Sequence, residues 1–159
     1  MMKRMLCLII ALTLSVLFTG QALGQAQSLP PDEVFESARE ALVMLSNRQF
    51  DAASQLLGSK ISASALRKEI DANCKWLYST FVQNEIAVAW ISSGQLYLAV
   101  PFEQPADGYV DALVFSLNEN FEFTGAKHFV WSDVSQSFSE SAQVRWHLPY
   151  TPEYSIFVD

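Results

Sequence analysis

Two kinds of hydrophobic pattern follow one another along the chain. Within residues 33–81, apolar side chains recur at intervals of three and four, which places them on one side of an α-helix. Pro31-Asp32-Glu33 is typical of a helix start, Gly58 of a helix end, and either Ser62 or Ser64 can cap a later helix. The pattern therefore predicts three helices, the last of which extends to residue 81.

From residue 82 onward the apolar positions recur at intervals of about two, as expected for strands with one buried face. Ser93-Gly94 and Asn118-Glu119-Asn120 are typical of hairpin turns. Because strands joined by short turns run antiparallel, we predict one antiparallel sheet. Its expected strands are Glu85–Ser92, Gln95–Phe102, Tyr109–Leu117, Phe121–Trp131, Gln143–Leu148 and Ser155–Val158.

Helices followed by strands indicate an α+β fold, in which the N-terminal helices pack on one face of a curved antiparallel β-sheet. About 50 helical residues would bury too little surface alone. We therefore expect one domain over residues 33–159, helical in 33–81 and a sheet in 82–158. Ser132–Ala142, which is rich in serine and acidic residues, is expected to be a mobile loop.

The N-terminal segment is typical of a secretory signal peptide. Lys3 and Arg4 precede the apolar run Met5–Phe18, and small residues follow before Gly24. The run is shorter than the roughly 20 residues that a membrane-spanning helix needs. We therefore predict a signal peptide at 1–24, cleaved after Gly24 or Ala26, a linker at 25–32, and a periplasmic or secreted protein without a membrane anchor.

The net charge of the chain limits the kinds of partner that we expect it to bind. It has 17 acidic and 10 basic residues among 159, a net charge of −7, which argues against nucleic acid as a ligand. Residues 76–159 hold only Lys127 and Arg145 as basic residues, so this half is acidic. That acidity predicts a solvated surface, with a docking face for a basic partner as the alternative.

Sequence signatures of catalysis are absent. The chain has no glycine-rich phosphate loop, nucleophile elbow or paired metal-binding cysteines, so we predict no metal and no cofactor. His128 and His147 are expected on different strands near the surface. Cys74, the one cysteine after the signal peptide, shares a helical stripe with Leu66 and Ile70, which favours an inert buried thiol.

Three stretches resemble one known superfamily. Leu42–Leu57 (LVMLSNRQFDAASQLL), Tyr97–Phe129 and Trp146–Tyr150 (WHLPY) look like the helix pair, the sheet and the tail of nuclear-transport-factor-2-like domains, which have a cystatin-like cone fold. The likeness is to the small domain that precedes a serine hydrolase in some exported bacterial proteins. The sequence ends at Asp159 without a hydrolase domain, so we expect no esterase activity to carry over. The resemblance implies an apolar pocket and a homodimer through the sheet.

These observations lead to three hypotheses. The first is a non-catalytic exported binding module for a small apolar ligand or a protein, with Tyr97, Phe115 and Trp131 as candidate ligand-binding residues. The second is an isomerase or dehydratase, which the resemblance to ketosteroid isomerases suggests. In it Asp111 would act with Tyr97, and His128 is a further catalytic candidate. We favour instead a solvated Asp111 at the end of its strand.

The third hypothesis is a periplasmic inhibitor or immunity protein. It would use the acidic sheet half to cover the basic cleft of an enzyme. Small size, the signal peptide and the uneven charge distribution all motivate it. The sequence leaves the choice among the three open.

Overall fold

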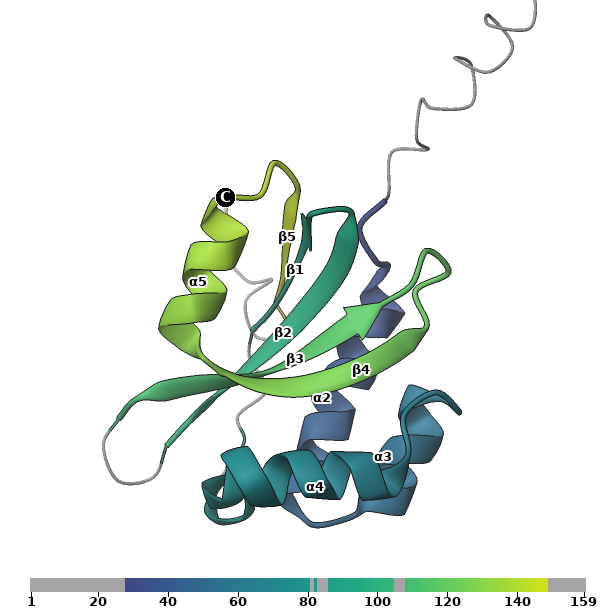
Figure 1. Cartoon of the computed structure of the whole chain (residues 1–159), viewed down its shortest axis with the longest axis vertical. Coiled ribbons are helices and arrows are strands. Elements are labelled where there is room, and N and C mark those ends of the chain that lie inside the picture. Colours follow the sequence, from purple (N-terminus) through teal and green to yellow (C-terminus); the bar gives the residue numbers. More distant parts are fainter. Residues whose placement is uncertain (1–27, 81, 83–85, 105–107, 149–159) are drawn as a thin grey trace, which may run out of the picture.

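The computed structural model describes residues 28–80, 82, 86–104 and 108–148. The signal peptide, the first residues of the linker and the predicted strand Ser155–Val158 lie outside the described residues. The described part is an α+β fold, as the sequence predicts (Figure 1). Its elements are α2 (Asp32–Ser46), α3 (Phe50–Leu57), α4 (Ala63–Asn73), the 3-10 helix η1 (Lys75–Ser79), β1 (Ala87–Ser92), β2 (Gln95–Glu103), β3 (Val110–Leu117), β4 (Phe123–Val130), α5 (Trp131–Ser139) and β5 (Val144–His147).

The strands form one curved, open sheet in the order β4-β3-β2-β1-β5, and all neighbours are antiparallel. Ser93 and Gly94 join β1 to β2 with φ angles of 51° and 75°, as a tight two-residue hairpin turn requires. At the β3–β4 turn, the Asn118 side chain accepts hydrogen bonds from the amides of Asn120 and Glu122. Both predicted turns are confirmed.

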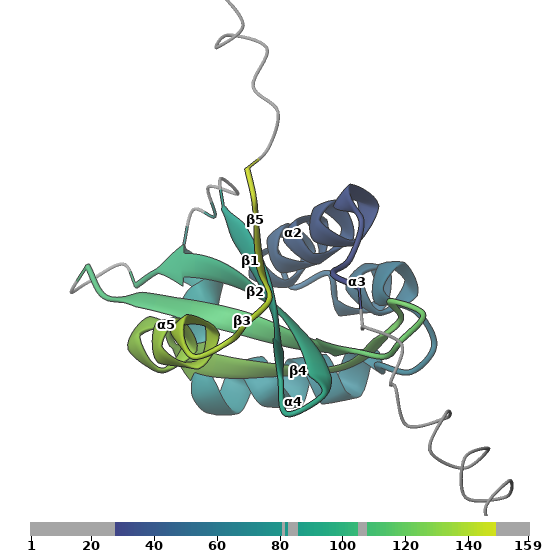
Figure 2. The ribbon, with the colours of Figure 1, turned by 90° about the horizontal axis from the view of Figure 1, so that it is seen from above.

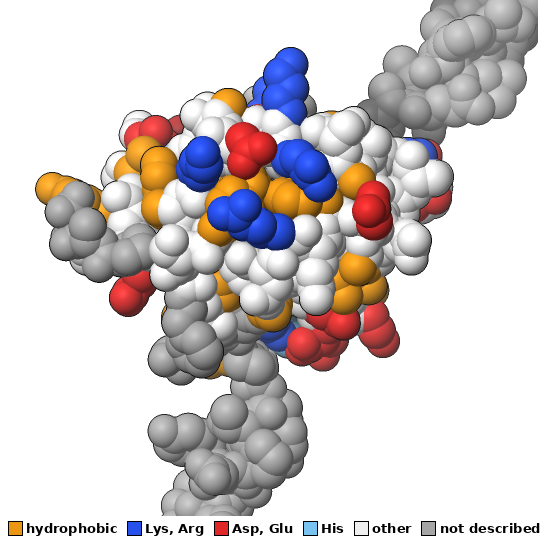
Figure 3. All heavy atoms as spheres, turned by 90° about the horizontal axis from the view of Figure 1, so that it is seen from below, with side chains coloured by type: hydrophobic (Ala, Val, Ile, Leu, Met, Phe, Trp, Pro, Cys, Tyr) orange, Lys and Arg blue, Asp and Glu red, His pale blue; other side chains and the backbone are white. Residues whose placement is uncertain are grey.

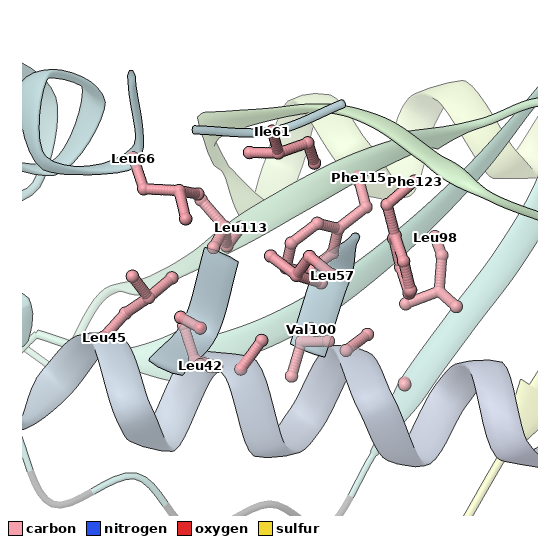
Figure 4. Packing of buried hydrophobic residues seen from close by; sticks show 14 of the residues in the cluster. Leu42, Leu45, Leu57, Ile61, Leu66, Leu98, Val100, Leu113, Phe115 and Phe123 are labelled. Carbon is pink, nitrogen blue, oxygen red and sulfur yellow. The ribbon is translucent and has the colours of Figure 1, made fainter. Parts of the chain in front are cut away.

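One face of the sheet is covered by α2, α3 and α4, and the main core lies between these layers (Figure 2). Leu42 and Leu45 of α2 point toward Leu113 and Phe115 of β3, and all four are fully buried (Figure 4). Burying each such side chain stabilises the fold by roughly 1.5–3 kcal/mol. The helices and the sheet therefore share one core.

The opposite face of the sheet carries α5, and the prediction of a mobile loop at Ser132–Ala142 is wrong. Trp131, Val134 and Phe138 recur at helical spacing and pack with Trp90 into a second, smaller core. The Trp90 Nε1 donates a hydrogen bond to Ser137 Oγ at 3.0 Å. Serine is a weak helix former, so packing against the sheet, and not local propensity, holds this helix.

The third predicted helix is shorter than expected. Ser62 caps α4 by accepting a hydrogen bond from the Ala65 amide, and the helix ends at Asn73. Cys74 then breaks it with φ −149° and ψ 46°, and the chain continues as η1. The break turns η1 toward the sheet, where Trp76 hydrogen-bonds Asp111. Residue 81 lies outside the described residues.

Candidate functional site

Asp111 and Tyr97 lie on opposite faces of the sheet. In β3, Asp111 shares the face of Leu113 and Phe115, which is covered by the N-terminal helices. In β2, Tyr97 faces α5 and stacks on Trp90 with 5.5 Å between ring centroids. The two side chains therefore do not open into a common cavity.

Asp111 is fully buried, so the expectation that it is solvated at the end of its strand is wrong. Its Oδ2 accepts hydrogen bonds from Trp76 Nε1 at 3.0 Å and from Gln104 Nε2 at 2.8 Å. These donors come from η1 and from the end of β2. A buried carboxylate is costly unless it is paired or hydrogen-bonded, so these two donors explain why Asp111 is tolerated inside.

His128 accompanies Asp111 on the neighbouring strand. Its Nε2 lies 3.2 Å from Asp111 Oδ2, without the alignment of a hydrogen bond, and its ring meets Trp76 edge to face at 5.6 Å. Two atoms of the pair, Asp111 Oδ1 and His128 Nε2, are buried without a hydrogen-bond partner. The structure thus brings together two of the sequence candidates and separates Tyr97 from them.

Both histidines are more buried than expected. The side chains of His128 and His147 are 14% and 12% exposed. His147 of β5 stacks on Phe35, and its Nδ1 lies 2.7 Å from Arg39 Nη2. They lie on different strands, as predicted, and each ring faces the helices, whose side chains cover most of it.

Cys74 is buried, as predicted, and lies close to the Asp111 cluster. Burial, and to a smaller extent the charges of Glu69 and Asp111, together raise the pKa of its thiol from 9.0 to about 12. A thiol with this pKa stays protonated near neutral pH and is a poor nucleophile. The polar cluster around Asp111 therefore lacks an activated cysteine.

The three candidate ligand-binding residues do not form one site. Phe115 is fully buried in the main core, where its ring contacts Phe123 edge to face at 5.3 Å. Tyr97 is partly buried on the other face, where α5 packs, and Trp131 is the partly buried first residue of α5 itself. Phe115 is therefore a core residue and is not accessible to a ligand.

The structure instead has a groove at the edge strand β4. It has a volume of about 420 Å³ and opens between α4 and β4. Ile61 and Leu66 form its apolar wall on the helix side, whereas Tyr97 and Phe129 lie beyond the strand. Its further lining residues are Lys60, Ala65, Glu69, Val114, Ser116, Thr124, Gly125, Ala126 and Lys127. Sequence reasoning missed this groove, and Gly125 within a strand was the one signal for it.

Basic residues gather around the groove although the whole chain is acidic. Seen from the side of α4, lysine and arginine side chains lie beside apolar surface, with acidic side chains among them (Figure 3). Lys60 and Lys127 line the groove itself. Arg67, Lys68 and Lys75 are exposed on and just after α4. Acidic side chains lie among them, because Glu69 lines the groove, Glu122 pairs with Lys60 and Asp71 is exposed on α4. The surface around the groove is therefore of mixed charge.

Within the described ranges, no group of three or more His, Cys, Asp or Glu side chains is arranged to hold a metal ion. Over the same residues, no helix combines the length and the apolar character that crossing a membrane requires. The comparisons with known proteins found no matching family model, no matching curated protein and no matching solved structure. The likeness to nuclear-transport-factor-2-like domains therefore stays a prediction.

Proposed function

We propose that this protein is an exported, non-catalytic binding module that holds its ligand or partner in the groove between α4 and β4. The observation that carries this proposal is the groove itself, which combines apolar walls with an open strand edge and two lysines. Binding sites are commonly concave and mostly apolar, with a few polar groups that orient the ligand. The groove has this composition.

The candidate catalytic groups favour binding over catalysis. Asp111 is fully buried and Tyr97 lies on the other face, so the isomerase alternative lacks the common cavity on which it depends. The inhibitor alternative invokes the acidic sheet half. The groove is lined by Lys60, Lys127 and a single acidic residue, Glu69, and the exposed Lys127 favours an acidic partner over a basic one.

The groove can be tested with a nuclear magnetic resonance screen of a fragment library against the mature protein. We expect a set of fragments to shift the amide resonances of Leu66, Gly125 and Ala126. Gly125→Leu should abolish these shifts, because a side chain there would extend into the groove. A Cβ at Gly125 would meet only Ser116, at 3.8 Å, so the first atom of the new side chain fits without a clash.

The matched control is Ser139→Leu, which adds the same side chain at an exposed position of α5. It should leave fragment binding unchanged. Binding of fragments only outside the groove, or no binding at all, would contradict the proposal.

Export is tested separately. We expect the chain expressed in a bacterial host to reach the periplasm or the medium, with a mass corresponding to a start at Gln25 or Gln27. Retention of the uncleaved chain in the cytoplasm or the membrane would contradict this part of the proposal. The result for export does not depend on the fragment screen.

A further inference from the structure

The outer edge of β4 is the feature of the groove that most limits which class of ligand can bind. β4 pairs only with β3 in the described sheet. In an antiparallel ladder, main-chain groups of alternate residues point away from the partner strand. The amide of His128 does so, because it donates to Glu69 Oε1 at 2.9 Å. By the same alternation, the N–H and C=O of Ala126 point outward into the groove.

We propose that the groove binds an extended, acidic segment of a partner polypeptide, which adds as a further strand to the outer edge of β4. This inference rests on the proposed function and names the class of partner. Main-chain hydrogen bonds to a strand edge recognise any extended peptide, whereas the walls of the groove select its side chains.

The walls match the alternation of a strand. Successive side chains of an added strand would point to opposite sides. One set would face α4, where Ala65 is exposed and the buried Leu66 lies behind it, and the other would pass the exposed Phe129. Gly125 leaves space between these walls, since it has no side chain. An extended peptide therefore uses both sides of the groove, which a compact ligand would not.

The charges select an acidic segment. Two of the lining residues are lysines and one is a glutamate, and Glu69 already accepts the His128 amide. Lys60 already pairs with Glu122 at 2.5 Å, so Lys127 is the lining lysine that an acidic side chain of the segment would meet. Lys127 is exposed at the strand edge.

The same lysines disfavour a second copy of this chain as the occupant. Edge lysines are a common device against edge-to-edge pairing of identical strands. In a symmetric pairing of β4 with β4, Lys127 and Lys60 of both copies would gather along one seam. A heterologous acidic segment has no such repulsion.

The test is a display selection of random dodecapeptides on the mature protein, followed by calorimetry with the synthetic peptides that are enriched. We expect enriched peptides to carry Asp or Glu at alternating positions and to shift the resonances of Gly125 and Ala126. N-methylation of the central peptide residues should abolish binding, because it removes main-chain donors. Lys127→Glu should weaken binding by at least about tenfold.

Lys75→Glu is the matched control. It makes the same charge change at an exposed lysine that does not line the groove, and should change affinity by less than about twofold. Thermal unfolding of both variants verifies that they are folded. Equal loss of affinity in the two variants would overturn the proposal. It would mean that the peptide is attracted by the overall charge of this surface and not by Lys127 in the groove.

Other outcomes also overturn the inference. These are a lack of enriched peptides, enrichment without acidic residues, peptide shifts outside the groove, and concentration-dependent self-association through β4. If fragments bind the groove while peptides do not, the proposed function stands and the inference of a polypeptide partner is wrong. If neither binds, both fail.

Discussion

Asp111 and His128 lie opposite the same indole, that of Trp76, with 3.2 Å between the carboxylate Oδ2 and the imidazole Nε2. This cluster joins η1, β2, β3 and β4 at one end of the main core. Arg39 apart, Asp111 is the only buried polar residue among the residues described. The cluster therefore holds these elements in position. We expect its removal to lower the free energy of unfolding.

Asp111→Ala should lower the free energy of unfolding by about 3 kcal/mol, because it leaves the Trp76 and Gln104 donors buried without an acceptor. Asp111→Asn, which keeps an acceptor, should cost less. Urea unfolding followed by tryptophan fluorescence measures both. The control is Glu119→Ala at an exposed turn position, which should be neutral. A loss below about 0.5 kcal/mol for Asp111→Ala would refute the structural role.

Alkaline pH should destabilise the protein. Burial raises the pKa of Cys74 from 9.0 to about 12. Burial and a hydrogen bond to Asp71 raise the pKa of Tyr78 from 10.0 to about 12. The unfolded chain loses these protons first, so unfolding releases protons. The stability contribution is complete below pH 9 and decreases as pH rises toward 12.

Melting temperatures measured between pH 8 and 11 test this expectation. The wild-type curve should fall with pH, and Cys74→Ala and Tyr78→Phe should each flatten it. Asn47→Ala, an exposed substitution without a titratable group, serves as control. A wild-type curve that stays level up to pH 11, or variants that fall as steeply as the wild type, would contradict the raised pKa values.

Phe138→Ala should destabilise α5 and expose the second face of the sheet. The Phe138 ring contacts Trp90, Trp131 and Trp146 at centroid distances of 6.2, 5.9 and 5.1 Å. We expect a loss of about 2–3 kcal/mol in unfolding free energy. Hydrogen exchange should show faster exchange across residues 131–139. Ser139→Ala provides the control, and an unchanged exchange rate in Phe138→Ala would mean that α5 is not packed.

Arg39→Met should release β5 from α2. Arg39 is 2% exposed, pairs with Glu36 at 2.7 Å and lies 2.7 Å from His147 Nδ1. Methionine keeps the apolar stem but not the guanidinium, so we expect about 2 kcal/mol of destabilisation. Amide exchange of β5 should accelerate more than that of β3. Lys68→Met on the surface of α4 should change neither, and uniform acceleration of all strands would argue against a local anchor.

The sequence was sufficient to predict the caps and turns that depend only on residues close together in the chain. Ser62, Gly58 and Ser93-Gly94 each act within a few residues, so the caps and turns followed from residue type. α5 was missed because its serine-rich sequence has weak propensity, and Trp131, Val134 and Phe138 form a stripe only against the sheet. The end of α4 was missed because apolar spacing continues through Leu77, although the backbone breaks at Cys74.

The site was less predictable than the fold. Asp111 and His128 were candidates, but hydrophobic periodicity does not show which residues of adjacent strands lie side by side. Their contact could therefore not be predicted. The hydrogen-bond partners Trp76 and Gln104 come from other elements of the fold. The groove depends on which strand is at the edge of the sheet. That order follows from tertiary pairing, in which β5 joins β1 and leaves β4 unpaired outside.

The contact between α2 and β5 also has a consequence for how the chain folds during its synthesis. Arg39 and His147 are 108 positions apart, so their contact needs the first helix and the last described strand together. Until synthesis has passed His147, β1 lacks one neighbour and Phe35 lacks its stacking ring. The emerging polypeptide therefore cannot complete its native fold until His147 has been synthesised.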